Sequence, residues 1–133
     1  MLSVDFKMPI VYPSLRQVSQ KVFFAKRPTA EVFGIVNEGV GTGICNLFFY
    51  NNEMKGHTWQ RVIALLYHYL NQILPDEKKK KLIVRSDNCG NQNKNRYVFM
   101  FLAYVLLKFN LKTVRLDCLL PGHSKFSCDR YFG

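Results

Sequence analysis

Three aspartates lie in settings that could serve metal-dependent chemistry. Asp87 follows the apolar run 82–84 and opens a dense polar cluster that extends to Asn95. An acid at the end of a buried strand is a common place for catalysis or binding. Asp5 lies inside the first apolar segment and Asp129 lies in the closing segment. Acids from three separate parts of the chain could therefore meet in one metal site.

The chemistry expected of such a site depends on hard divalent cations. Mg²⁺ and Mn²⁺ prefer carboxylate oxygens and keep other positions for water and substrate phosphates. Two such ions can activate a water or hydroxyl and stabilise the leaving oxygen of a phosphodiester. Asp5 and Asp87 would lie side by side if their strands are neighbours. The spacing leaves an alternative, in which Asp87 caps a turn through Asn88 and Gly90 and Asp5 faces solvent.

The polar cluster after Asp87 could contact a sugar-phosphate backbone. Amide side chains offer donors and acceptors that suit such contacts. The same residues routinely make local hydrogen bonds, so an asparagine-rich turn is an equal alternative. The amides in question are Asn88, Asn91, Gln92, Asn93 and Asn95. Three basic residues are candidate phosphate contacts: Lys94, Arg96 and Lys125.

The elements that would position these residues begin with strand patterns. Apolar and polar residues alternate over 2–7, and Pro9 and Pro13 are expected to end this strand. The β-branched and aromatic runs 31–36 and 43–50 flank a glycine-rich connection, which predicts a hairpin.

The second half of the chain alternates helix and strand patterns. Thr58 is a candidate N-cap for a helix over about 58–74, and Asn95 for an apolar helix over 96–109. Short strands are predicted at 82–84 and 113–120. A meander followed by strands joined through crossover helices predicts an α/β fold with a mixed sheet and helices packed on it. One domain over 1–133 is expected.

Composition indicates the class of partner. Lys and Arg outnumber Asp and Glu by 19 to 9, which gives a formal charge of +10 and a pI near 9.6. Such an excess favours polyanions, with nucleic acid first and an anionic membrane surface second, although a merely soluble basic protein is the alternative. The longest apolar stretch, 97–109, is well short of the roughly 20 residues that cross a bilayer, so we expect no membrane span.

The cysteines indicate a reduced, intracellular setting. Four are widely spaced, and no signal-peptide pattern is expected at the N-terminus. A zinc site is a rival hypothesis, because Cys118, His123 and Cys128 follow a C-x4-H-x4-C spacing that Cys89 could complete. Position 115 is arginine, so the local C-x2-C partner is absent. Buried cysteines without zinc are therefore preferred. Trp59 could stack on bases, although core packing is the stronger interpretation at its spacing.

Three motifs carry a resemblance to a known family. They are Val4-Asp5-Phe6, then Ser86-Asp87-Asn88-Cys89-Gly90-Asn91-Gln92-Asn93-Lys94-Asn95, then Gly122-His123-Ser124 with Asp129-Arg130-Tyr131-Phe132-Gly133. Together they resemble an uncharacterised domain common in transposon-derived animal genes, whose core is similar to ribonuclease H. The likeness spans nearly the whole chain, and the two later motifs are the more specific.

The resemblance implies a ribonuclease-H-like sheet of the kind shared by DDE transposases and retroviral integrases. Such folds place one acid on the first strand, a second just after the fourth strand and a third on a helix after the fifth. Asp5, Asp87 and Asp129 would then be the catalytic metal ligands for Mg²⁺ or Mn²⁺, with Asn88 and His123 as auxiliary residues. Because Gly133 follows Asp129 so closely, we expect that helix to be missing or barely begun and the domain to be truncated at its C-terminus.

Two classes of function follow from the resemblance. The first is a metal-dependent transposase or integrase that cleaves or joins DNA, which would place the protein in the nucleus. The second is a domesticated or inactive relative that binds nucleic acid or protein without cutting. The first two acids favour the first class, and the short C-terminal segment favours the second.

Overall fold

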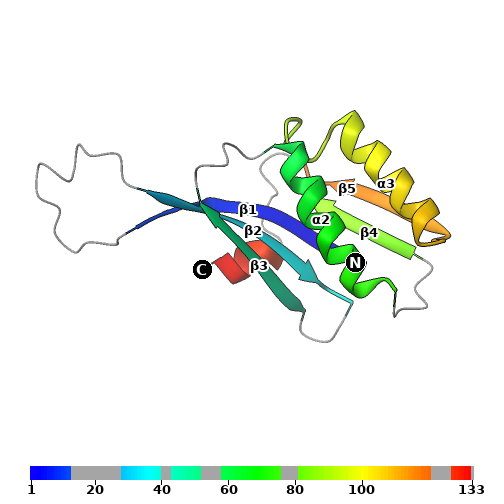
Figure 1. Cartoon of the computed structure of the whole chain (residues 1–133), viewed down its shortest axis with the longest axis horizontal. Helices are drawn as coiled ribbons and strands as arrows, with labels where there is room; N and C mark the ends of the chain where they lie inside the picture. The colour runs from blue at the N-terminus through cyan, green and yellow to red at the C-terminus, as the bar shows by residue number, and fades with distance from the viewer. Residues whose placement is uncertain (13–27, 40–42, 52–57, 76–80, 121–126, 133) are drawn as a thin grey trace, which may run out of the picture.

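A mixed β-sheet forms the centre of the molecule, with helices on both of its faces (Figure 1). The computed structural model describes residues 1–12, 28–39, 43–51, 58–75, 81–120 and 127–132. The strands are β1 (Leu2–Val11), β2 (Thr29–Asn37), β3 (Ile44–Asn51), β4 (Lys81–Ser86) and β5 (Thr113–Cys118). The helices within these ranges are α2 (Trp59–Ile73), α3 (Arg96–Lys108) and α4 (Ser127–Phe132).

The strand order is β3-β2-β1-β4-β5. β1, β2 and β3 form an antiparallel meander, whereas β4 pairs in parallel with both β1 and β5. The predicted α/β fold with a meander, parallel strands and packed helices is therefore confirmed. The central position of β1 results from pairing between distant segments, since Leu2 pairs with Val84 and Ser3 with Arg85.

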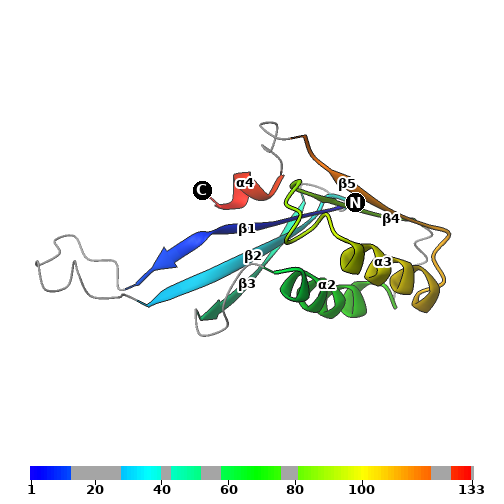
Figure 2. The same ribbon diagram turned by 90° about the horizontal axis from the view of Figure 1, so that it is seen from above.

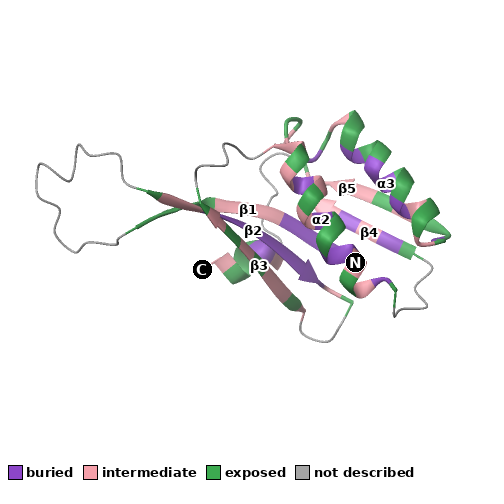
Figure 3. Cartoon of the chain, in the orientation of Figure 1, coloured by how far each residue is buried: buried purple, intermediate pink, exposed green. Residues whose placement is uncertain are grey.

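The main hydrophobic core lies between the sheet and the helices α2 and α3. Leu2 and Val4 on β1 contribute to it together with Val84 on β4. Leu70 of α2 and Val105 of α3 pack in the same core and are fully buried. Each such side chain contributes about 1.5–3 kcal/mol through removal of its apolar surface from water. The buried stripes of both helices face the sheet in Figure 3.

The short helix α4 packs on the opposite face of the sheet, as Figure 2 shows. Cys128 anchors it, since this side chain is 0% exposed and its thiol donates to the carbonyl oxygen of Ser3 at 3.2 Å. Gly34 on β2 allows the close approach of the Phe132 ring, because a Cβ atom there would lie 2.8 Å from two ring carbons. The helix expected after β5 is present as a short segment of six residues that carries Asp129.

The first strand is longer than the sequence predicts, because it continues past Pro9 to Val11. Its pairing with β2 shifts in register between Lys7 and Ile10, which places the proline in a bulge. A proline is tolerated at such a place because no ladder hydrogen bond from its nitrogen is required. The prediction that Pro9 would end the strand is wrong for this reason.

The N-cap positions of α2 and α3 agree with the sequence, but only one of the two residues makes a capping bond. Asn95 is the N-cap of α3 and accepts hydrogen bonds from the backbone nitrogens of Tyr97 and Val98. Thr58 occupies the N-cap position of α2, but its side chain makes no capping bond. In the ranges that the structure describes, no helix has the length and apolar character needed to cross a bilayer.

Candidate functional site

The pairing of β1 with β4 sets the relative positions of Asp5 and Asp87. Ser3 of β1 pairs with Arg85 of β4 in the parallel ladder. Asp5 and Asp87 each follow two residues after this pair. Successive side chains alternate between the faces of a sheet. Residues 3 and 5 of β1 and residue 85 of β4 therefore share one face, and Asp87 follows immediately after β4. The predicted adjacency of the two strands is confirmed.

This face of the sheet is the one that α4 covers. Lys7 of β1 donates from Nζ to the carbonyl oxygen of Phe132 in α4. Asp5 is half-buried, and one of its carboxylate oxygens accepts a 2.8 Å hydrogen bond from the backbone nitrogen of Phe6. The even-numbered side chains Leu2 and Val4 point to the other face, into the main core. Asp5 thus lies between the sheet and α4 and not in free solvent.

Asp87 is held by the loop 87–95 that follows β4. Its Oδ1 atom accepts a hydrogen bond from Nδ2 of Asn93 at 2.7 Å and another from the backbone nitrogen of Cys89 at 3.2 Å. Within the described part of the chain no hydrogen bond to Oδ2 is present. One oxygen of Asp87 therefore caps the turn, which is one of the two alternatives that the sequence offers, and no described residue hydrogen-bonds to the other oxygen.

Two amide oxygens beside Asp87 are buried without a hydrogen-bond partner, namely Oδ1 of Asn88 and Oδ1 of Asn93. Asn93 is 1% exposed. It therefore cannot serve as the surface contact to nucleic acid that we predicted, and it orients Asp87 instead. Buried amide oxygens need a donor or a cation, since leaving them unpaired costs about 1–3 kcal/mol.

Asp129 lies in the first turn of α4 and its side chain is exposed. Burial raises the pKa of the neighbouring Cys128 thiol, and the negative charges of Asp5 and Asp129 act in the same direction. Both acids therefore lie within electrostatic reach of one thiol. The fold thus brings the acids of β1 and α4 to the same face of the sheet.

The three acids do not form a ready-made cluster. Across the residues that the structure describes, no group of three or more His, Cys, Asp or Glu side chains is arranged to hold a metal ion. Two predicted site residues, His123 and Lys125, lie outside the described ranges.

The rival zinc pattern finds no support in the positions of the cysteines that are described. All four cysteines are free, and Cys128 of α4 is buried against β1, where its thiol donates a hydrogen bond to the carbonyl oxygen of Ser3. The raised pKa of this thiol disfavours the thiolate that zinc requires. His123, the central residue of the pattern, lies outside the described residues.

The remaining predicted contacts to nucleic acid surround the loop 87–95. Asn91, Lys94 and Arg96 are exposed. Gln92 is half-buried, and its backbone carbonyl accepts a bond from Asn95. Asn91, Lys94 and Arg96, and Gln92 in part, are therefore accessible to solvent.

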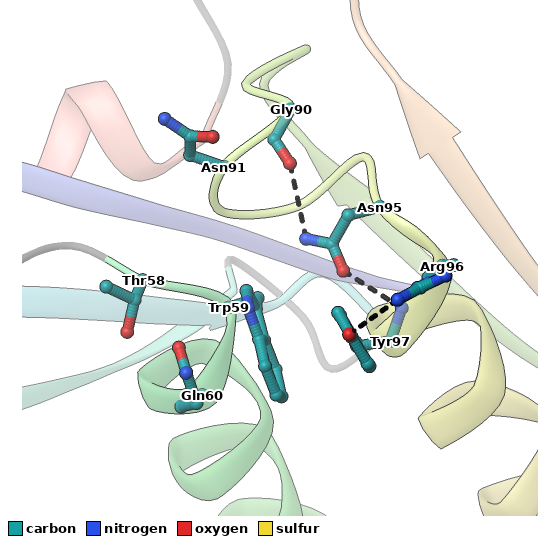
Figure 4. Close-up of a pocket in the computed structure, with 8 residues that line it drawn as sticks. All are labelled: Thr58, Trp59, Gln60, Gly90, Asn91, Asn95, Arg96 and Tyr97. Atoms are coloured by element: carbon teal, nitrogen blue, oxygen red, sulfur yellow. Dashed lines mark hydrogen bonds between the residues drawn. The ribbon is translucent and has the colours of Figure 1, made fainter.

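A pocket of about 560 Å³ opens beside this loop, at the first turns of α2 and α3 (Figure 4). Its lining includes the aromatic rings of Trp59 and Tyr97, whose centroids lie 4.2 Å apart with an interplanar angle of 14°. The guanidinium of Arg96 lies over the ring of Tyr97, with Cζ 4.8 Å from the ring centroid. Sequence reasoning missed this pocket, because Trp59 and Tyr97 lie far apart in the chain.

A second feature missed by the sequence is the position of Glu38, which lies in the turn directly after β2. Its carboxylate accepts hydrogen bonds from the hydroxyls of Ser3 on β1 and Ser127 on α4. Burial alone would raise the pKa of Glu38. The two hydrogen bonds, with the positive charges of Arg85 and the N-terminus, outweigh that effect and lower the pKa below its ordinary value.

The geometry defines an α/β domain with a mixed sheet, acids from a central strand, a strand end and a short helix, and an exposed polar loop. The chain belongs to a family described as a domain of unknown function (DUF7869), whose family model matches residues 24–133. The matched range contains Asp87 and Asp129 and begins after Asp5. No curated protein and no solved structure matches the chain.

Proposed function

We propose that this protein is a nucleic-acid-processing domain of the ribonuclease-H-like class, related to transposases and integrases, that cleaves or joins DNA phosphodiesters with Mg²⁺ or Mn²⁺. Asp5, Asp87 and Asp129 would be the metal-binding catalytic residues. One observation carries the proposal: β1 and β4 are parallel neighbours that pair Ser3 with Arg85, so Asp5 and Asp87 each follow two residues after this pair.

The order of elements supports the class. The strand order places β1 between the meander and the parallel strands, and the three acids follow the chain positions that the resemblance implies. Asp5 lies on β1, Asp87 just after β4 and Asp129 on a helix after β5.

The residues around Asp87 fit a hard cation. Oδ2 of Asp87 is not engaged by the described residues, and Oδ1 of Asn88 is buried without a partner. Carboxylate and amide oxygens are the donors that Mg²⁺ and Mn²⁺ prefer. The ion would activate a water or hydroxyl and stabilise the leaving oxygen of the phosphodiester.

The chain itself would position the ligands and the strand. Asn93 and the backbone of Cys89 fix the direction of the Asp87 carboxylate, which lowers the entropic cost of holding a ligand. Lys94 and Arg96 are exposed at the same loop and would neutralise backbone phosphates.

A second candidate is a relative that keeps the fold and binds nucleic acid or protein without cleaving it. The absence of a three-residue metal group among the described residues favours this alternative. Both candidates use the basic charge of the chain to bind nucleic acid. Only a measurement of phosphodiester cleavage therefore distinguishes them.

A plasmid-nicking assay tests the first candidate. Supercoiled DNA is incubated with the 133-residue chain in the presence of Mg²⁺ or Mn²⁺, and nicked circles are quantified. We expect metal-dependent nicking that Asp87→Asn lowers by more than about 100-fold, because even outer-shell residues of metal sites are worth 10- to 100-fold.

The matched control is Asp117→Asn on β5, because the carboxylate of Asp117 is already paired with Arg115 at 2.7 Å. This variant should keep its nicking activity. Circular dichroism of both variants checks that the fold is intact. DNA binding without metal-dependent cleavage of any DNA form would establish the binding module in place of the nuclease.

A further inference from the structure

The pocket beside loop 87–95 has features of a binding site for a planar ring. Its volume of about 560 Å³ lies in the usual range for ligand sites. Trp59 and Tyr97 stack nearly parallel, and Arg96 lies on the far side of the tyrosine. The side chains of Thr58 and Gln60 lie on the other side of the indole from Tyr97 (Figure 4).

The stack is only partly buried. Tyr97 is 39% exposed and Trp59 is half-buried. A pair that served packing alone would be covered by other apolar groups, whereas this pair borders an open pocket lined by polar side chains. Trp59 packs against the main core with part of its surface, and both rings also line the pocket.

Polar groups with spare hydrogen-bonding capacity surround the rings. Gln60 and Asn91 are exposed, and the hydroxyl of Thr58 makes no capping bond. Asn95 is not available, because its side chain caps α3 and donates to the carbonyl oxygens of Gly90 and Gln92. Carboxamides offer one donor group and one acceptor, which matches the edge of a nucleobase.

We propose that this pocket binds an unpaired base of a DNA strand, which extends the stack on the indole of Trp59. Gln60 and Asn91 hold the edge of the base. Arg96 contacts the adjoining phosphate, since its guanidinium uses one nitrogen on the Tyr97 hydroxyl at 2.8 Å and keeps further donors. The pocket is lined in part by Gly90 and Asn91, which belong to the same loop 87–95 as Asp87. The identity of the strand as DNA rests on the proposed function.

The test uses the fluorescence of Trp59, the one tryptophan of the chain. All binding is measured in EDTA, so the result does not depend on metal or on cleavage. The probe is a single-stranded oligothymidylate of about ten nucleotides, within the range of single-strand site sizes. We expect saturable quenching by this strand and little quenching by an abasic strand of the same length.

Variants locate the binding. Stacking on one aromatic residue accounts for about 5- to 150-fold in affinity, so Trp59→Ala should weaken binding of a labelled strand by this factor. Trp59→Phe should retain most of the affinity. The matched control is Tyr104→Ala, which removes an exposed ring elsewhere on α3 and should change little.

Three results would overturn the inference. The first is equal quenching by the abasic strand, and the second is equal weakening by Tyr104→Ala. The third is quenching by thymidine monophosphate at the same concentration as the strand, which would assign the pocket to free nucleotides. The wild-type quenching needs no variant, so a misfolded Trp59→Ala protein does not remove the test. Quenching without metal-dependent nicking would preserve the pocket and refute the nuclease, and nicking without quenching would do the opposite.

Discussion

The two carboxylate oxygens of Asp87 lie in different surroundings. Oδ1 is fixed by Asn93 and by the backbone of Cys89, while Oδ2 makes no hydrogen bond within the described part of the chain. A carboxylate held at one oxygen presents the other in a defined direction. This division explains how a residue that caps a turn can also serve as a ligand.

At the residue scale, Asn93→Ala should destabilise the protein. The change removes a 2.7 Å bond to a carboxylate from a side chain that is 1% exposed. Hydrogen bonds to charged groups contribute about 1.5–3 kcal/mol, so the free energy of unfolding should fall by about that amount in urea titrations. Asn91→Ala, at an exposed position of the same loop, should stay within about 0.5 kcal/mol of wild type. Equal effects of the two variants would show that Asn93 does not support Asp87.

Single residues were only partly predictable from the sequence. The role of Asn95 as a cap depends on its immediate neighbours, and it is confirmed. The burial of Asn93 depends on how the loop closes on Asp87, which no spacing rule describes. The stack of Trp59 on Tyr97 joins the first turns of two helices, so it emerges only when α2 and α3 pack side by side.

At the scale of elements, α4 is held on the sheet by a small number of specific contacts. Cys128 is buried against β1, Phe132 approaches Gly34 on β2, and Ser127 donates to Glu38 at 2.6 Å. Because α4 is short, propensity alone would not keep it helical. Its tertiary contacts therefore determine where Asp129 lies.

The Glu38 contact predicts a pH-dependent difference in stability. The pKa of Glu38 is lower in the folded protein than its ordinary value of 4.5. A lowered pKa adds stability that is complete above the unfolded value and disappears as the pH falls through the folded one. Glu38→Gln should therefore be less stable than wild type at neutral pH, and this gap should close below pH 4.5.

Thermal unfolding of both proteins across this pH range measures the effect. Ser127→Ala serves as an intermediate case, since it removes one of the two serine donors to Glu38. A gap between wild type and Glu38→Gln that stays constant with pH, or widens in acid, would show that Glu38 is not held as a carboxylate by these contacts.

Elements were more predictable than the way they pair. Alternation and turn residues predicted the hairpin of β2 and β3, and helical spacing predicted α2 and α3. The parallel pairing of β1 with β4 joins opposite halves of the chain, and the sequence indicated it only through a resemblance. The error at Pro9 arose because a local rule against proline does not account for a bulge.

At the scale of the whole molecule, the formal charge of +10 should dominate association with DNA. Affinity for duplex DNA should fall steeply with salt, with a slope of about −0.9 in log K against log salt for each phosphate neutralised. Lys94→Ala and Arg96→Ala should each reduce that slope by about one and weaken binding to all sequences alike. Fluorescence anisotropy at several salt concentrations measures both effects.

Lys112→Ala is the matched control for the salt experiment. Lys112 is exposed just before β5. Because β4 and β5 run parallel, it lies at the end of these strands opposite to the end that leads into loop 87–95. This variant should change the slope less than the loop variants do. A flat salt response would contradict an electrostatic interface, and a loss confined to one sequence would mean that Lys94 or Arg96 reads bases.

The proposed function requires Asp5 and Asp87 to share a divalent ion on the face of the sheet covered by α4. Crystals of the wild-type chain grown with Mn²⁺, examined by anomalous diffraction, test it most directly. We expect an anomalous peak in contact with carboxylate oxygens of both Asp5 and Asp87, and its loss in Asp87→Asn crystals. A well-ordered loop 87–95 with no peak between these two residues, or with Mn²⁺ bound only elsewhere, would contradict it.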